Sequence, residues 1–195
     1  MLLARRCKMR FVKAMTDPRV TFAELQTWPD DGRRYELYDG EAIVVPSPFP
    51  RHQRVVKHLG DVLGEYEDTH GGVLLNAPID IIFDEHNVLQ PDLVYFREER
   101  RHVVHDWEVT RAAPDLAVEV LSRSTEARDR GRKMQILARF GVAEYWLVDP
   151  AKNTVEIYVL NGQAFEFAAA IDDAGAVKSP TVPGLSFDTA SIFAP

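Results

Sequence analysis

Glu119 stands in a segment where only apolar residues are expected. It lies within Asp115–Leu121, where Leu116, Val118 and Val120 alternate with Ala117, Glu119 and Leu121. Both faces of this segment are apolar apart from Glu119, as in an interior strand that is covered on both sides. Burying a carboxylate costs roughly 2–7 kcal/mol unless it is paired, protonated or bound to a cation. Because a second acid, Asp92, begins another apolar run, the two acids together predict a metal site.

Lys133 could bring a positive charge to these acids. On a helix predicted over residues 125–140, Ile136, Leu137 and Phe140 follow it at +3, +4 and +7, so it shares their apolar stripe. Asp129 lies one turn earlier on the same face. A lysine there could instead pack its stem and extend its amine to water. Directed toward two carboxylates, it would suit phosphodiester hydrolysis: acids bind Mg²⁺ or Mn²⁺, and an amine stabilises charge in the transition state.

Four segments in this order resemble a known family. They are Gln90-Pro-Asp-Leu-Val-Tyr-Phe96, Ala113-Pro-Asp-Leu-Ala-Val-Glu-Val-Leu-Ser-Arg-Ser-Thr125, Asp129-Arg-Gly-Arg-Lys133 and Gly141-Val-Ala-Glu-Tyr-Trp-Leu-Val-Asp-Pro150. Together with Tyr35–Glu41 and Arg51-His-Gln53, they resemble the Uma2 (DUF820) family over roughly residues 17–190. That family belongs to the PD-(D/E)XK nuclease superfamily. The resemblance implies a restriction-endonuclease-like α/β (mixed α+β) fold, a central mixed sheet flanked by helices, and a Mg²⁺- or Mn²⁺-dependent DNA endonuclease.

The resemblance also implies roles for individual residues. Asp92 and Glu119 would be catalytic metal ligands, and Lys133 the catalytic lysine. The superfamily's usual lysine lies two residues after the second acid, where this chain has Leu121, so the amine would come from the next helix instead. Glu41 matches a further family acid, which could complete the metal shell or simply face water. Gln90 and Gln53 could form hydrogen bonds with a ligand or water beside the metal site.

Basic side chains gather after Glu119. Residues 122–139 contain six basic and two acidic side chains, a net charge of +4. Such a patch would offset repulsion between the acids and a nucleic-acid backbone. A solvated helix face with ordinary salt pairs is the alternative. The residues expected to contact nucleic acid are Arg123, Arg128, Arg130 and Arg132.

The composition narrows the class of protein. The chain has 195 residues, 46% of them hydrophobic, with a formal net charge of −7, so it is not a basic nucleic-acid binder as a whole. Cys7 is the only cysteine, which suits a reducing cytoplasm and excludes an internal disulfide. No apolar run is long enough to span a bilayer. Residues 1–14, which carry five basic side chains and no acid, are expected to form a disordered extension before a single domain over residues 15–195.

Local patterns predict the elements that would position the site. Thr21 and Glu24 predict a capped helix, and Asp39-Gly40 predicts a hairpin turn. An apolar stripe predicts a helix over 51–69 that Gly71-Gly72 ends. Strands are expected over 73–83 and 93–96 around a hairpin-like turn at Asp84–Asn87, then over 115–121, 144–148, 154–160 and 163–171. A helix with Ser124 as its N-cap is expected to end at Gly141, and residues 97–113 are expected to form a loop that could include a short helix.

Two other functions remain open at this point. A non-catalytic nucleic-acid-binding or interaction protein could keep the same fold, although it would have no reason to keep a buried acid. A glycosidase also needs two carboxylates, but it would leave Lys133 and the arginines without a role. If the chain cuts duplex DNA, a homodimer would bring two sites to the two strands.

Overall fold

A computed structural model describes residues 19–172 and 175–194, so the predicted extension at residues 1–14 lies outside the described residues. Within these ranges the elements are, in chain order, α1 (Phe22–Leu25), β1 (Arg34–Tyr38), β2 (Glu41–Val45), α2 (Pro50–His70), β3 (Val73–Asn76), β4 (Ile81–Asp84), β5 (Asn87–Leu89), β6 (Leu93–Phe96), the 3₁₀ helix η1 (Glu98–Val103), β7 (Leu116–Val120), α3 (Glu126–Arg128), the π-helix η2 (Asp129–Lys133), α4 (Met134–Arg139), β8 (Glu144–Asp149), β9 (Thr154–Asn161), β10 (Ala164–Ile171), β11 (Ala176–Lys178), β12 (Ser186–Asp188) and α5 (Thr189–Phe193).

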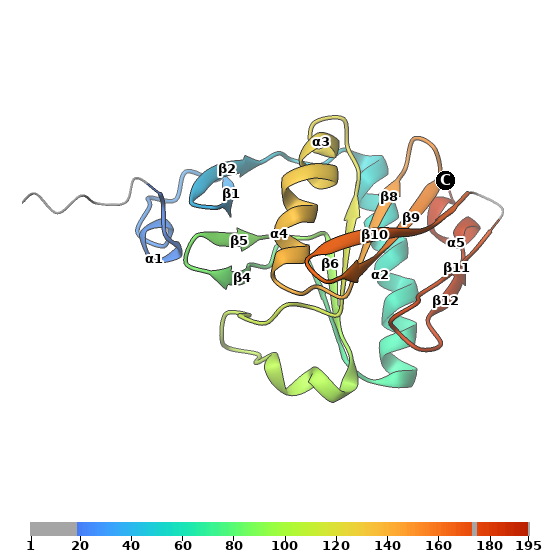
Figure 1. Cartoon of the computed structure of the whole chain (residues 1–195). Coiled ribbons are helices and arrows are strands. Elements are labelled where there is room, and N and C mark those ends of the chain that lie inside the picture. Colours follow the sequence, from blue (N-terminus) through green and yellow to red (C-terminus); the bar gives the residue numbers. More distant parts are fainter. Residues whose placement is uncertain (1–18, 173–174, 195) are drawn as a thin grey trace, which may run out of the picture.

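A mixed six-stranded sheet forms the centre of the molecule, in the order β10-β9-β8-β7-β6-β3 (Figure 1). Strands β7 and β8 are parallel, whereas the other neighbouring pairs are antiparallel. Helix α2 covers one face of this sheet and α4 covers the other (Figure 1). The predicted mixed α/β class, with a central sheet between helices, is confirmed.

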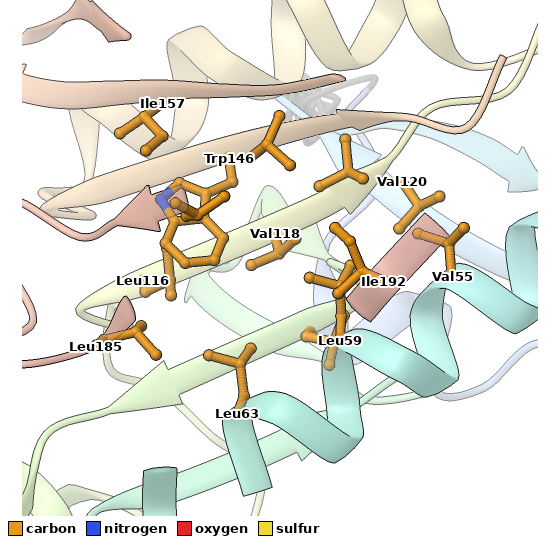
Figure 2. Packing of buried hydrophobic residues seen from close by; sticks show 14 of the residues in the cluster. Val55, Leu59, Leu63, Leu116, Val118, Val120, Trp146, Ile157, Leu185 and Ile192 are labelled. Atoms are coloured by element: carbon orange, nitrogen blue, oxygen red, sulfur yellow. The ribbon is translucent and has the colours of Figure 1, made fainter. Parts of the chain in front are cut away.

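The two faces of β7 pack into different clusters, as the alternation predicted. Leu116, Val118 and Val120 pack with Val55, Leu59 and Leu63 of α2 (Figure 2). The opposite face places Ala117 and Leu121 with Ile136 and Leu137 of α4. Glu119 belongs to this second face and is 5% exposed, so the predicted buried acid is present.

A smaller antiparallel sheet, in the order β2-β1-β5-β4, lies beside the central one. The predicted hairpin is confirmed: β1 and β2 pair from Tyr38↔Glu41 outward, and both turn residues, Asp39 and Gly40, have positive φ. The capping box between Thr21 and Glu24 at the start of α1 is also confirmed. The chain crosses from the smaller sheet to the central one through residues 90–92, and this crossing carries Asp92.

One predicted strand is wrong. The segment 73–83 forms two strands, β3 in the central sheet and β4 in the smaller sheet, and β4 makes its hairpin with β5 rather than with β6. Proline explains both breaks, because it lacks the N–H that an interior strand needs. Pro78 separates β3 from β4, and Pro91 separates β5 from β6.

The helix predicted to run to about residue 140 is present but irregular. It consists of α3, the π-helical turn η2 and α4, and it ends at Gly141 with φ 85°. Its N-cap is Thr125 rather than Ser124, and no side chain caps it; the N–H of Glu126 donates to the Ser122 carbonyl instead. A π-helical turn inside an α-helix is common at functional sites, and this one contains both Asp129 and Lys133.

The C-terminal segment adds elements that the sequence did not predict. Strands β11 and β12 form a two-stranded sheet, and α5 follows them. Ile192 and Phe193 of α5 pack into the cluster between α2 and the central sheet. Among the described residues, no helix combines the length and apolar character needed to cross a membrane.

Candidate active site

Asp92 and Glu119 meet because β6 and β7 pair side by side. Leu93 lies opposite Val118 and Val94 opposite Ala117, so continuing this register by one residue places Asp92 opposite Glu119. Asp92 Oδ2 accepts a hydrogen bond of 2.8 Å from the N–H of Val120, which holds the Asp92 side chain against β7. The pairing predicted from two separate sequence motifs is therefore a consequence of strand register.

Lys133 reaches Glu119 from the helix above this face of the sheet. Its Nζ lies 2.5 Å from Glu119 Oε1, and the two residues are 3% and 5% exposed. The contact is a buried ion pair. The sequence prediction that the lysine faces the sheet, rather than water, is thus confirmed in the structure.

Glu36 also contacts Lys133, although no role was predicted for Glu36 from the sequence. This residue of β1 is 1% exposed, and its Oε1 lies 2.9 Å from Lys133 Nζ. The N–H of Gln90 donates to Oε1 (2.7 Å) and the hydroxyl of Tyr38 to Oε2 (2.7 Å). Burial raises the pKa of Glu36, but Lys133 and these donors outweigh it and hold the pKa below its usual value. Glu36 is therefore a charged partner that fixes the position of the lysine.

The site holds more buried acid than buried base. Burial opposes the charge on Lys133, but Glu119 and Glu36 outweigh it and raise the lysine's pKa well above its usual value. Burial also raises the pKa of Glu119 well above normal; Lys133 opposes this shift, while Asp129 and Asp92 add to it. One ammonium group therefore faces several carboxylates, so the buried negative charge exceeds the buried positive charge.

Asp129 adds to this excess. Asp129 is 1% exposed, and neither of its carboxylate oxygens has a hydrogen-bond partner in the part of the chain that the structure describes. Burial raises the pKa of Asp129, while Lys133 and the hydroxyl of Thr125 oppose that shift. A buried carboxylate in this condition favours a proton or a cation nearby.

A cavity of about 90 Å³ opens beside these groups, with room for several waters or a hydrated ion. Its walls include Asp92, Glu119, Lys133, Gln53, Gln90 and Arg128. Gln53 and Gln90, the two glutamines predicted to bind a ligand or water, therefore both line the cavity. Within the described ranges, the Oε1 of Gln90 has no hydrogen-bond partner. The Nε2 of Gln90 donates to Asp80 at 2.8 Å, which fixes the orientation of the amide.

His52 supports Asp92 from α2. Its Nε2 lies 3.2 Å from Asp92 Oδ2, the same oxygen that accepts from the Val120 N–H. A histidine that contacts a metal-binding carboxylate orients that ligand, which is a common arrangement around metal sites.

The donor set suits a magnesium-type ion more than a closed protein cage. Within residues 19–172 and 175–194, no group of three or more His, Cys, Asp or Glu side chains has the arrangement of a complete metal site. Mg²⁺ commonly binds through one or two carboxylates and fills its other positions with water and substrate phosphate. Asp92 and Glu119, which line the same cavity, fit that pattern.

Other predicted residues lie elsewhere. The side chain of Glu41 is 64% exposed and pairs with Arg132 Nη1 at 2.5 Å, so the structure does not bring it to the cavity. Arg130 makes two hydrogen bonds with Glu156, of 2.6 and 2.9 Å, and a third with Glu126. The structure therefore places salt pairs, the alternative considered for the basic patch, at two of the four arginines.

Arg128 and Arg123 differ from that pair. Arg128 lines the cavity, and its guanidinium lies 5.8 Å from the centroid of the Tyr38 ring. Its buried Nε has no hydrogen-bond partner among the residues that the structure describes. Arg123 is exposed in the turn between β7 and α3. Both remain available to contact a ligand outside the chain.

Comparisons with known proteins agree with this geometry. No curated protein matches the chain. Among solved structures, a protein from Anabaena variabilis ATCC 29413, described as "a putative nuclease belonging to DUF820", superposes with a TM-score of 0.74. The match covers 90% of this chain and 98% of that one at 21% identity, which establishes the shared fold. The sequence profile of Uma2, described as "Putative restriction endonuclease", matches residues 22–190. The chain therefore belongs to the Uma2 family.

Proposed function

We propose that the protein is a Mg²⁺- or Mn²⁺-dependent endonuclease that hydrolyses phosphodiester bonds of DNA. One observation carries the proposal: Asp92 and Glu119 line one cavity from adjacent strands, and the amine of Lys133 lies 2.5 Å from Glu119. Membership of a family described as "Putative restriction endonuclease" supports the reaction class.

In this proposal Asp92 and Glu119 hold the ion, and Gln53 and Gln90 hydrogen-bond water or substrate at the cavity wall. A bound divalent cation supplies positive charge that polarises the scissile phosphate and acidifies water. Asp92 keeps its orientation through the Val120 N–H and His52. A cation held there would add positive charge beside the buried carboxylate of Glu119, which also contacts Lys133.

Lys133 serves as the fixed positive charge of the site. Its raised pKa keeps it protonated at neutral pH, so it donates hydrogen bonds and does not act as a base. Held by Glu36 at 2.9 Å, the amine can stabilise the negative charge that develops on the phosphate oxygens. Arg128 and Arg123 are the proposed contacts to the flanking phosphates, since Arg130 and Arg132 are engaged with acids.

Cleavage assays on supercoiled plasmid, single-stranded and duplex oligonucleotides, and RNA test this function, each with Mg²⁺, Mn²⁺ or EDTA. We expect metal-dependent cleavage of DNA. Asp92→Asn, Glu119→Gln and Lys133→Ala should each lower it roughly 100-fold or more, as expected when a group that stabilises the transition state is lost. Asp61→Asn is the matched control, because Asp61 is exposed on α2, where it forms an ion pair with Lys57.

Two results would contradict the proposal. Full cleavage by the Lys133 variant would remove the role given to the amine. Tight DNA binding without turnover on any substrate, at any metal concentration, would favour the alternative of a catalytically inactive nucleic-acid-binding protein. Calorimetric titration of Mn²⁺ into the wild type and Glu119→Gln separates failure of metal binding from failure of chemistry.

A further inference from the structure

Phe49 presents an aromatic ring to solvent where the cavity opens. The residue is 72% exposed, yet it also lines the cavity that contains Asp92, Glu119 and Lys133. A phenylalanine ring left in water contributes almost none of the burial energy that normally stabilises a fold. Its position is therefore better explained by a ligand at the cavity than by packing within the chain.

The segment around Phe49 restricts the backbone that carries the ring. Prolines stand at 46, 48 and 50, and Pro50 opens helix α2. Phe49 is the N-cap residue, with φ −80° and ψ 159°, the extended conformation that a residue before proline prefers. Because each proline fixes its own φ, the backbone of this segment has little conformational freedom left to lose when a ligand binds.

Cations stand on the walls of the same cavity. Arg34 and Arg128 both line it, and they share it with the exposed ring and the buried acids. Aromatic rings that stack on bases, together with cations that follow the phosphates, are the usual means of binding single-stranded nucleic acid. The combination here places such a ring next to the candidate site of phosphodiester hydrolysis.

The position of Phe49 decides which bases it could contact. Its ring lines the cavity and is 72% exposed, so it can meet a base that approaches from solvent. In a continuous duplex both faces of each base are covered by its neighbours. An aromatic side chain can stack only on a base that is unpaired, at a strand end or turned out of the stack.

We propose that Phe49 stacks on an unpaired nucleobase beside the scissile phosphate, so that the substrate class is nucleic acid with a single-stranded or flipped nucleotide at the cleavage point. This inference rests on the proposed nuclease function and adds the substrate's structure to it. Phe49 is a positioning residue, since it would contact a base and not the reacting atoms.

The test uses single-stranded and fully paired oligonucleotides that carry one 2-aminopurine, whose fluorescence falls when it stacks. Binding is measured in the non-cleaving Asp92→Asn background with Ca²⁺, and cleavage in the otherwise unchanged chain with Mg²⁺. We expect quenching with the single strand, and affinity about 5- to 150-fold weaker after Phe49→Ala, which corresponds to the 1–3 kcal/mol typical of one stacked base. Phe49→Tyr should restore it. Phe167→Ala, 59% exposed on β10 and outside the cavity, should change nothing.

The outcomes separate this inference from the function beneath it. Metal-dependent cleavage that Phe49→Ala leaves unchanged on every substrate would overturn the stacking role and leave the nuclease intact. No cleavage and no binding of any oligonucleotide by the wild type would overturn both. A loss of binding in Phe49→Ala that Phe49→Tyr does not restore would point to damage of the loop and would also reject stacking.

Discussion

The Nζ of Lys133 lies 2.9 Å from Oε1 of Glu36, which joins a π-helical turn over the central sheet to the first strand of the smaller sheet. Both residues are at most 3% exposed. The lysine is therefore held from two sides, by Glu36 and by Glu119. This arrangement makes Lys133 important for stability as well as for chemistry, and the two roles can be separated by experiment.

Lys133→Met should destabilise the fold by about 3–5 kcal/mol at neutral pH, because it leaves two buried carboxylates without a counter-charge. In the wild type the pKa of Glu36 is lowered, so its stabilising contribution is present above its unfolded pKa and is lost as the pH falls through the folded value. Without the amine, burial would raise that pKa, and the variant would lose stability as the pH rises.

The gap between wild type and Lys133→Met should therefore widen from about pH 4.5 to about pH 7.5, measured as the free energy of urea unfolding. Lys57→Met is the control, because Lys57 makes an exposed pair with Asp61 that is worth about 1 kcal/mol or less. A constant gap across this range would show that the carboxylates do not depend on Lys133.

Glu36→Gln tests whether Glu36 positions the lysine. Glutamine keeps an acceptor for the Gln90 N–H but removes the charge that faces Lys133. We expect the cleavage rate constant to fall roughly 10- to 100-fold, the usual effect of losing a group that orients a catalytic residue. Affinity for Mn²⁺ should change little, since Glu36 is not a proposed ligand. A loss of Mn²⁺ binding with an unchanged rate at saturating metal would instead make Glu36 a ligand.

His52→Ala should act on the metal rather than on the lysine. His52 contacts Asp92 at 3.2 Å, so its loss should weaken Mn²⁺ binding roughly 10- to 100-fold while high metal restores most of the cleavage. Calorimetry and metal-dependence curves measure the two effects. His70, at the other end of α2, provides the control variant His70→Ala. If cleavage by His52→Ala stayed low at saturating Mn²⁺, the orienting role would be wrong.

Glu41→Gln addresses the acid that the sequence left undecided. Because its side chain is 64% exposed and bound to Arg132, cleavage should stay within about twofold of wild type, as expected for a surface substitution. The assay is the metal-dependent cleavage of plasmid. A drop comparable to that of Asp92→Asn would mean that Glu41 moves to the metal when substrate binds.

The periodicity of apolar residues was sufficient to predict which residues are buried at the centre of the site. Glu119 interrupts an otherwise apolar strand, and Lys133 lies on an apolar helical stripe, so both were predicted to be buried, as the structure has them. Glu36 gave no such signal, because Arg34, Glu36 and Tyr38 alternate with Tyr35 and Leu37, which suggests a solvent-facing acid. Its burial depends on how the smaller sheet packs against the π-helical turn, which is a tertiary effect.

Other differences also arise from contacts that are distant in sequence. Arg130 was expected to face nucleic acid, but it forms hydrogen bonds with Glu156 of β9, which is 26 residues away in the sequence. The π-helical turn is defined by i→i+5 hydrogen bonds, for which residues 129–133 carry no distinctive sequence pattern. By contrast, Pro78 and Pro91 do mark where β3 and β5 end, and they offered a local signal against one long strand.

The carboxylate of Glu144 offers a stability test that is independent of the active site. It is fully buried on β8 and accepts hydrogen bonds from Trp146 Nε1, the hydroxyls of Ser179 and Thr181, and the Thr181 N–H. These bonds tie the segment after β11 to the central sheet. Glu144→Ala would leave the buried Trp146 Nε1 and the half-buried donors of Ser179 and Thr181 without this acceptor, so we expect a loss of roughly 2–5 kcal/mol in the free energy of unfolding. Hydrogen exchange should show faster opening of β11 and β12. Glu166→Ala, at an exposed position on β10, is the control, and equal stabilities of the two variants would show that the Glu144 network does not hold the C-terminal segment.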